Sequence, residues 1–216
     1  MSEGQARDLR DYRKWHDDYD EPGSRLHLRL LVVQDLIARA LDELRPGPLR
    51  MISMCAGQGR DILTVAQRHR RGSEITGRLV ELDPDNAAGA RATVTSSHLD
   101  GIEVVVGDAG TTDAYAGAVP ADLVLVCGVF GNIPDEDIER TIRLLPTLCG
   151  AGAWTIWTRY PGGDAFERIP SWLETAGFVI ESLVVSGRDS FSVGAARLAG
   201  LPAPFAAGER LFTFTR

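Results

Sequence analysis

The chain has 216 residues, of which 44% are hydrophobic and 25% charged, with a formal net charge of −7. This composition is ordinary for one soluble globular domain. No stretch of the sequence approaches the ~20 apolar residues that a membrane-spanning helix needs. The acidic balance disfavours a nucleic-acid partner. Three scattered cysteines, Cys55, Cys127 and Cys149, predict neither a disulfide framework nor a zinc site. The polar start lacks the apolar centre of a secretion signal, so we expect a cytoplasmic monomer or homodimer without a membrane partner.

The first segment, residues 1–23, is dense in aromatic side chains. Tyr12, Trp15 and Tyr19 fall at helical spacing, and His16 stands next to Trp15. We expect this segment to form a lid that closes over a ligand and excludes water. The alternative is an amphipathic helix packed on the body of the protein or on a partner subunit. Residues 24–216 are expected to form the remaining domain.

Helices and strands alternate from residue 24 onward. Apolar residues at steps of three and four predict a helix over 24–44, which the following Arg-Pro-Gly-Pro sequence stops. The other expected helices are 58–70, 84–95, 135–145 and 165–176. The expected strands are 49–54, 75–82, 102–106, 122–127, 153–158, 178–185 and 210–215, with a short additional strand at 191–197. Basic residues 68–71 are interpreted as a solvated helix end.

Short apolar strands that alternate with longer helices predict an α/β fold. We expect a single doubly wound sheet, mostly parallel with an antiparallel C-terminal strand, and covered by helices on both faces. In such a sheet, ligands bind beyond the carboxyl ends of the strands, where the strand order reverses. The residues that directly follow each strand are therefore the candidates for function.

These strand ends carry an ordered set of residues. Gly57 and Gly59 follow the first strand, so the backbone there can approach a ligand closely. Glu81 ends the second strand, 22 residues after Gly59, at the separation at which an acid accepts hydrogen bonds from a ribose. Asp108 follows the third strand. Each feature alone is weak, but their conjunction predicts a nucleoside site.

Two common nucleotide motifs do not fit this site. A dinucleotide-binding turn needs a small residue three places after the second glycine, and this chain has Ile62 there. A phosphate loop needs a Gly-Lys-Ser/Thr sequence, which does not follow the turn. A nucleotide-cofactor oxidoreductase is therefore the weakest of the interpretations that remain.

With these motifs, the sequence resembles the class I S-adenosylmethionine-dependent methyltransferases. The resemblance covers about residues 49–160 by motif and the rest by strand–helix order. It implies a Rossmann-like sheet and S-adenosyl-L-methionine as the cofactor. It also implies cofactor contacts for Ala56, Gly57 and Gly59 at methionine and ribose, Glu81 and Leu82 at ribose, Asp108 and Ala109 at adenine, and Cys127 and Gly128 at the methyl-transfer site.

The sequence departs from the usual pattern of that family at the first strand. The family pattern is acid-x-Gly-x-Gly-x-Gly, but here Ser53 replaces the acid and Cys55 replaces the first glycine. Because the acid often holds the amino end of the cofactor in that family, that contact must come from elsewhere or be weaker. Asp61, Arg60 and the N-terminal segment are the candidates.

The resemblance implies an in-line methyl transfer in which the protein positions the acceptor and helps to remove its proton. His16 is the candidate general base, since an unperturbed imidazole has a pKa of ~6.5. Tyr19 and Tyr160 complete the catalytic candidates. No carboxylate follows the fourth strand until Asp135, which disfavours a metal-dependent mechanism.

Two functions from different classes are the leading candidates. The first is a methyltransferase acting on a small molecule, such as a natural-product intermediate, without a metal. The second is a non-catalytic sensor or accessory subunit that binds S-adenosylmethionine or S-adenosylhomocysteine. The acceptor atom, whether O, N, C or S, stays open.

Overall fold

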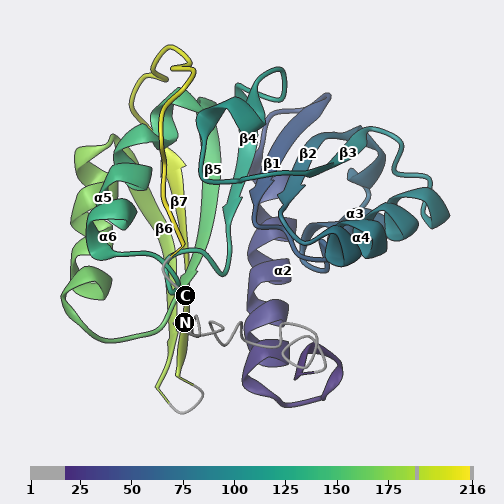
Figure 1. Cartoon of the computed structure of the whole chain (residues 1–216), viewed down its shortest axis with the longest axis horizontal. Helices are drawn as coiled ribbons and strands as arrows, with labels where there is room; N and C mark the ends of the chain where they lie inside the picture. The colour runs from purple at the N-terminus through teal and green to yellow at the C-terminus, as the bar shows by residue number, and fades with distance from the viewer. Residues whose placement is uncertain (1–17, 188–189, 215–216) are drawn as a thin grey trace, which may run out of the picture.

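The computed structural model describes residues 18–187 and 190–214. Its centre is one seven-stranded sheet with the order β3-β2-β1-β4-β5-β7-β6 (Figure 1). Strands β1 to β5 run parallel, and β7 is antiparallel to both of its neighbours. The strands are β1 (Leu49–Met54), β2 (Ile75–Glu81), β3 (Ile102–Val106), β4 (Ala121–Val126), β5 (Cys149–Arg159), β6 (Phe178–Ser186) and β7 (Phe191–Leu198). The predicted doubly wound α/β sheet is confirmed.

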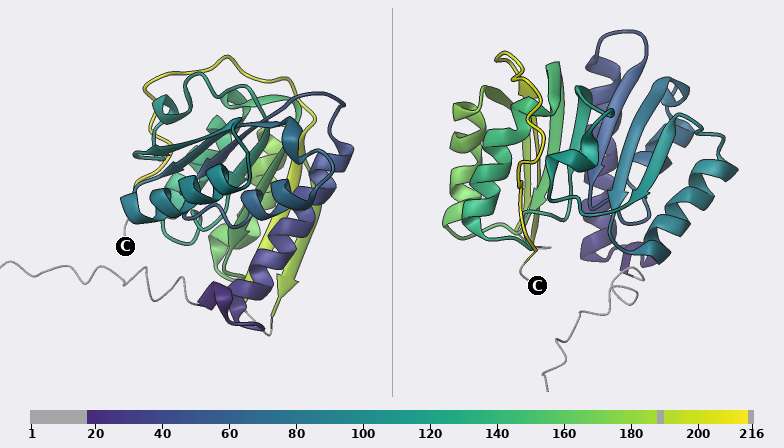
Figure 2. Two further views of the ribbon diagram at one scale, coloured as in Figure 1. Left: turned by 90° about the vertical axis from the view of Figure 1, so that its right-hand side faces the viewer. Right: turned by 45° about the horizontal axis from the view of Figure 1, so that its top comes forward.

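Helices cover both faces of the sheet (Figure 2). One face carries α2 (Arg25–Glu43), α3 (Ile62–Arg68) and α4 (Pro84–Ser96), and the other carries α5 (Asp135–Leu144) and α6 (Asp164–Thr175). Strand β4 is buried along its whole length, because Val124 and Val126 face one helix layer while Leu123 and Leu125 face the other. Within residues 18–187 and 190–214, no helix combines the length and the apolar character that a bilayer crossing requires.

Local chemistry sets the starts of the helices that follow β1 and β2. Pro84 opens α4, and the Asp83 carboxylate accepts from the backbone N–H groups of residues 85 and 86 at 2.8 and 3.2 Å. The helix predicted over 58–70 is shorter, since α3 begins at Ile62 and ends at Arg68. Gly57 and Gly59 have φ angles of +55° and +67°, so the chain turns there before a helix can form.

The strand predicted at 210–215 is wrong over its described residues, 210–214. Strand β7 already occupies the antiparallel position beside β5, so the chain end cannot pair there. The chain end packs on α5 instead, where the Thr213 N–H donates to Asp137 at 2.7 Å and the Leu211 carbonyl accepts from Thr141 at 3.0 Å. Side chains of α5 thus satisfy backbone groups that a strand ladder would otherwise pair.

The interpretation of the basic run as a solvated helix end is wrong for Arg71. Its side chain is buried, and its guanidinium donates to the carbonyls of Leu44, Arg45 and Gly47 at 2.8–3.1 Å. The guanidinium also donates to the Leu41 carbonyl in the last turn of α2, where helix carbonyls have no intrahelical partner. Arg71 therefore anchors the end of α2 to the segment that leads into β2.

Candidate functional site

The strand order reverses between β1 and β4, because β2 pairs with one edge of β1 and β4 with the other. The loops after the parallel strands leave the same edge of the sheet, and the N-terminal half of α2 extends past that edge (Figure 1). Two backbone bonds continue the ladders beyond the strands, from the Ala56 N–H to the Val80 carbonyl and from the Gly107 N–H to the Glu81 carbonyl, each 3.0 Å. The loops are therefore held in place by the sheet itself.

The turn after β1 is tightly packed against β2 and α3. Cys55 shares the left-handed conformation of the two glycines, with φ +52°. A Cβ atom on Gly59 would lie 2.7 Å from the Leu79 side chain and 2.8 Å from the Leu63 side chain. No side chain fits at Gly59 unless these leucines shift. Packing against these leucines is therefore a structural reason for glycine at this position, and the close approach of a ligand to the turn stays a prediction.

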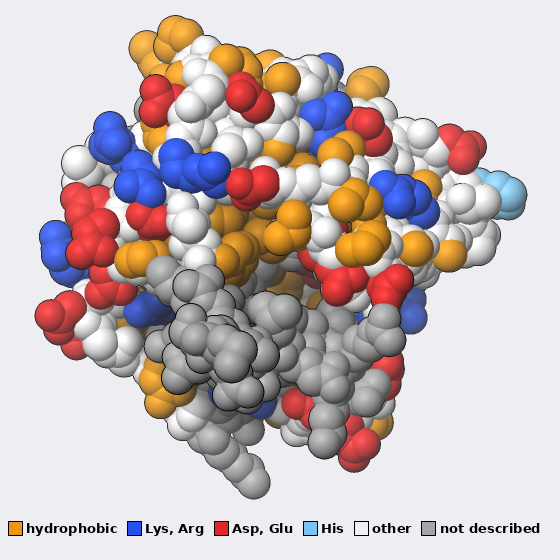
Figure 3. Space-filling model, viewed as in Figure 1, with side chains coloured by type: hydrophobic (Ala, Val, Ile, Leu, Met, Phe, Trp, Pro, Cys, Tyr) orange, Lys and Arg blue, Asp and Glu red, His pale blue; other side chains and the backbone are white. Residues whose placement is uncertain are grey.

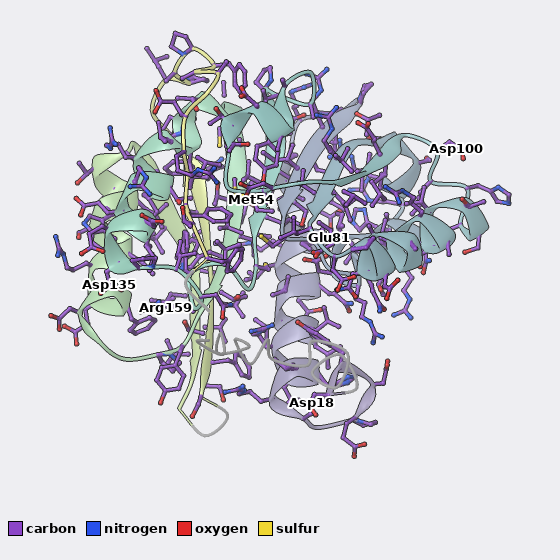
Figure 4. The ribbon with its side chains drawn as sticks, viewed as in Figure 1. Asp18, Met54, Glu81, Asp100, Asp135 and Arg159 are labelled. Carbon is purple, nitrogen blue, oxygen red and sulfur yellow. The ribbon has the colours of Figure 1, made fainter. Side chains whose placement is uncertain are left out.

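Glu81 is a buried carboxylate that the backbone holds in one orientation. One oxygen accepts from the Gly57 N–H at 2.7 Å, and the other accepts from the Asp83 N–H at 2.9 Å. An ionised carboxylate has about four acceptor positions, so each oxygen keeps capacity for a ligand hydroxyl. Glu81 and Met54, both labelled in Figure 4, lie at the ends of the neighbouring strands β2 and β1. Leu82 beside it is 69% exposed.

Asp108 has a partner that the sequence did not reveal. Its carboxylate accepts from the Gly110 N–H at 2.8 Å and from the Arg210 guanidinium at 2.6 Å. Both side chains of this ion pair are about half exposed. The neighbouring Ala109 is buried, and its carbonyl accepts from the Tyr115 hydroxyl at 2.8 Å. The chain end that carries Arg210 therefore borders the loop after β3.

A cluster of polar side chains lies at the switch point. The Arg29 guanidinium on α2 donates to the Tyr19 hydroxyl at 2.8 Å. Burial raises the pKa of the Tyr19 phenol, Arg29 opposes that rise, and Asp61 and Cys127 add to it. Burial also raises the pKa of the Asp61 carboxyl, while its hydrogen bond from the Ile62 N–H and the charge of Arg29 lower it. A cation and an acid thus lie together near the end of β1.

Arg60 ties the segment before α2 to the glycine turn. Its guanidinium makes two hydrogen bonds to the Asp20 carboxylate, at 2.6 and 3.0 Å, and lies 5.8 Å from the centre of the Tyr19 ring. The Arg60 carbonyl accepts from the Gln34 side chain at 2.9 Å. Arg60 is therefore engaged in holding residues 19 and 20 over the turn.

The other half of the site is a cleft beyond β4 and β5. Its volume is about 440 Å³, and its lining residues are Gly131, Asn132, Ile133, Pro134, Asp135, Arg159 and Tyr160. Tyr160 is 59% exposed at the end of β5. Next to the cleft, the Gly128 N–H donates to Thr158 at 2.8 Å, and its carbonyl accepts from Asn132 at 2.7 Å. On the face of the molecule that Figure 3 shows, hydrophobic side chains gather in the middle, with basic side chains to their left.

Most of the predicted site residues are thus at the carboxyl edge of the sheet, whereas His16 lies outside the described residues. The structure adds three arginines to the site that were not predicted from the sequence, Arg29, Arg159 and Arg210, and no local sequence signal marks them. Burial raises the pKa of the Cys55 and Cys127 thiols, which keeps both neutral near pH 7. Across residues 18–187 and 190–214, no three His, Cys, Asp or Glu side chains form a metal-binding group.

The architecture is shared with several solved methyltransferase structures. Magnesium protoporphyrin IX methyltransferase from Synechocystis PCC 6803, solved with bound S-adenosylmethionine, is similar with a TM-score of 0.69 at 15% identity, over 88% of this chain and 91% of that one. An O-methyltransferase family protein from Burkholderia thailandensis is similar with a TM-score of 0.64 at 17% identity, over 94% and 62% of the two chains. The chain therefore has the fold of class I S-adenosylmethionine-dependent methyltransferases.

The same fold also occurs in a methyltransferase that is named for RNA. An RNA methyltransferase from Salinibacter ruber, in complex with S-adenosylhomocysteine, has a TM-score of 0.50 at 15% identity, over 82% of this chain and 95% of that one. No protein-family model matches the sequence, and no curated protein does. The particular substrate must therefore be argued from the site.

Proposed function

We propose that this protein is an S-adenosylmethionine-dependent methyltransferase that acts on a small molecule, such as a natural-product intermediate, without a metal. The observation that carries the proposal is the Glu81 carboxylate, which backbone N–H groups hold beside the glycine turn at the switch point. Its unused acceptor positions suit the hydroxyls of a ribose. Solved structures of this fold contain S-adenosylmethionine or S-adenosylhomocysteine, which supports the same ligand here.

The proposed cofactor contacts follow the strand ends. Glu81 binds the ribose with Leu82 beside it, and Asp108 with the Ala109 backbone binds the adenine. Ala56, Gly57 and Gly59 line the backbone side, and Cys127 and Gly128 lie near the methyl group. These assignments combine the positions in the fold with the resemblance of the motifs.

Arg29 and Asp61 complete the site where the family acid is missing. Ser53 is 1% exposed within β1, so it cannot reach a ligand in the crevice. The Asp61 carboxylate is the proposed partner of the amino group of the cofactor, and the Arg29 guanidinium is the proposed partner of its carboxylate. An acid and a cation in one cluster match the two charges of an amino-acid group.

S-adenosylmethionine supplies a methyl group that its sulfonium already activates, so the protein mainly has to position the acceptor. The raised pKa of Tyr19 keeps its phenol protonated near pH 7, which suits a hydrogen-bond donor rather than a base. His16 is the proposed general base, Tyr160 faces the acceptor, and residues 1–23 form the proposed lid. Residues 127–134 carry no carboxylate, which supports a metal-independent transfer.

The acidic charge of −7 supports the absence of a nucleic-acid partner. We further propose that the protein is cytoplasmic, a monomer or homodimer, and has no membrane partner. The competing function, a sensor or accessory subunit that binds the cofactor without transfer, shares the same crevice.

Calorimetric titration with S-adenosylhomocysteine tests the binding site. Formation of S-adenosylhomocysteine from S-adenosylmethionine, in incubations with a panel of metabolites, then tests transfer. Binding together with acceptor-dependent product supports the methyltransferase, whereas binding without product for the whole panel favours the sensor. If S-adenosylhomocysteine does not bind, both functions are wrong.

A further inference from the structure

The cleft beyond β4 and β5 contains a guanidinium whose hydrogen bonds are incomplete. Arg159 ends β5 and has a side chain that is 16% exposed. One terminal nitrogen, Nη1, donates to the Phe130 carbonyl. Among the described residues, its Nε atom is buried and has no hydrogen-bond partner. A buried donor without an acceptor is costly, and such a group calls for an explanation.

The other terminal nitrogen of the Arg159 guanidinium, Nη2, is held only loosely. It lies 3.5 Å from the Asp135 carboxylate, at the outer limit of a hydrogen bond, and Asp135 is 56% exposed. Figure 4 shows both side chains on the α5 side of the molecule, with Asp135 at the start of that helix. Nε and Nη2 together form the pair of parallel donors that matches the two oxygens of a carboxylate. An exposed acid at this distance is a partner that a ligand can replace.

The rest of the lining is suited to a flat apolar group. Tyr160 is 59% exposed, Pro134 beside it is half-buried, and the buried Ile133 side chain lies beneath them in the lining. The volume of about 440 Å³ falls in the usual range of small-ligand sites, ~300–1,000 Å³. Aromatic ligands stack well on tyrosine rings. Asp135 is the one carboxylate in the described lining, and its charge disfavours a dianion such as a phosphate monoester.

Resting on the proposed function, we propose that this cleft binds the methyl acceptor and that the acceptor is an aromatic carboxylate. Arg159 binds the carboxylate through Nε and Nη2, and Tyr160 stacks on the aromatic ring. When the ligand is absent, the Asp135 carboxylate pairs with Nη2 instead. Arg159 is then a specificity residue, because it selects the anionic form of the acceptor. The cleft lies beside Gly128, on the methyl-transfer side of the switch point.

The test uses two probes that have the same shape and differ in charge, 2-naphthoate and its neutral amide, 2-naphthamide. The full-length protein is first saturated with S-adenosylhomocysteine, and the binding of each probe is then titrated by NMR up to millimolar concentrations. The variants are Arg159→Gln, Asp135→Asn and, as a control, Arg143→Gln. Arg143 is exposed in the last turn of α5 and makes the same change of charge outside the cleft.

We expect wild type to prefer the naphthoate, and Arg159→Gln to weaken naphthoate binding about tenfold or more, as for a lost bond between charged groups. Arg143→Gln should leave that binding unchanged, and the amide should respond to neither variant. Asp135→Asn should tighten naphthoate binding roughly threefold, because a competing exposed charge is removed. This last variant gives a result even if Arg159→Gln does not fold.

Three results would overturn the acceptor proposal. They are equal binding of the two probes to wild type, equal losses in Arg159→Gln and Arg143→Gln, and no naphthoate binding at millimolar concentration. Each leaves the cofactor site intact if S-adenosylhomocysteine still binds. If S-adenosylhomocysteine does not bind but the charge preference at Arg159 persists, the proposed function fails and the cleft remains a carboxylate site.

Discussion

The two halves of the crevice are built in different ways. In the half beyond β1 to β3, polar side chains accept from backbone N–H groups, as Glu81 does from Gly57 and Asp83. In the half beyond β4 and β5, the cleft is lined by long side chains, and Arg159 keeps a buried donor without a described partner. A site held by the backbone is rigid and suits a constant ligand. A site made of side chains is easily changed and suits the part of the reaction that differs between enzymes.

Two glycine substitutions should show the difference in rigidity between the two halves of the crevice most clearly. Gly59→Ala places a Cβ within 2.8 Å of two leucine side chains at a φ of +67°. It should lower the free energy of unfolding by about 2–4 kcal/mol and weaken S-adenosylhomocysteine binding. Gly131→Ala meets no atom within 4 Å and should cost under about 0.5 kcal/mol. Urea unfolding measures both, and equal losses would contradict the difference in rigidity.

Removal of the ribose acceptor should give the next largest effect. Glu81→Ala deletes hydrogen bonds to a charged group, and the loss is about 1.5–3 kcal/mol of binding free energy. Calorimetry should therefore show at least roughly tenfold weaker S-adenosylhomocysteine binding. Glu139→Ala, at an exposed position of α5, is the control and should bind normally. An unchanged constant in Glu81→Ala would refute the ribose assignment.

Arg29→Met tests whether the amino-acid end of the cofactor lies at the Arg29–Asp61 cluster. Loss of the guanidinium should weaken S-adenosylhomocysteine roughly tenfold, the lower limit for a bond between charged groups. Binding of 5′-methylthioadenosine, which lacks the amino-acid group, should change little. Arg25→Met, at an exposed position in the first turn of α2, is the matched control. Equal losses for both ligands would mean that Arg29 acts only on the fold.

Thiol alkylation tests whether the cofactor reaches the ends of β1 and β4. The raised pKa values of Cys55 and Cys127 keep both thiols neutral near pH 7, so iodoacetamide should react slowly and faster as the pH rises. S-adenosylhomocysteine should slow both reactions severalfold. Cys149 is buried with a pKa raised to about 12, and its rate should not respond. Full reactivity of both crevice thiols in the presence of ligand would place the cofactor elsewhere.

The smallest effect is expected at the ion pair between Asp108 and Arg210. Both side chains are about half exposed, and such pairs contribute about 0–1 kcal/mol. Arg210→Gln should therefore change the unfolding free energy by less than about 1 kcal/mol, and less still at high salt. A large loss of S-adenosylhomocysteine affinity in this variant would show that Arg210 belongs to the adenine site.

Much of the nucleoside half could be predicted from the sequence. The alternation of short apolar strands with longer helices gave the parallel strands β1 to β5, because both patterns arise from neighbouring residues. The glycines after β1 and the acids after β2 and β3 follow strand ends directly, so their place at one edge of the sheet follows once the strands are parallel. Their roles toward a ligand stay predictions that the variants above can test.

Only the tertiary structure decided the remaining features, and each depends on contacts between distant parts of the chain. Residues 210–214 have a strand-like sequence, yet they pack on α5 because β7 already pairs with β5. Arg29 reaches the crevice because α2 passes the sheet edge, and Arg210 meets Asp108 across 102 positions of sequence. In the sequence, nothing distinguishes Arg159 from the many other arginines of the chain. It becomes a candidate specificity residue because folding buries its Nε atom beside a cleft and leaves that atom without a described acceptor. Spacing along the chain cannot report burial or partners of this kind, since they arise only when the layers pack together.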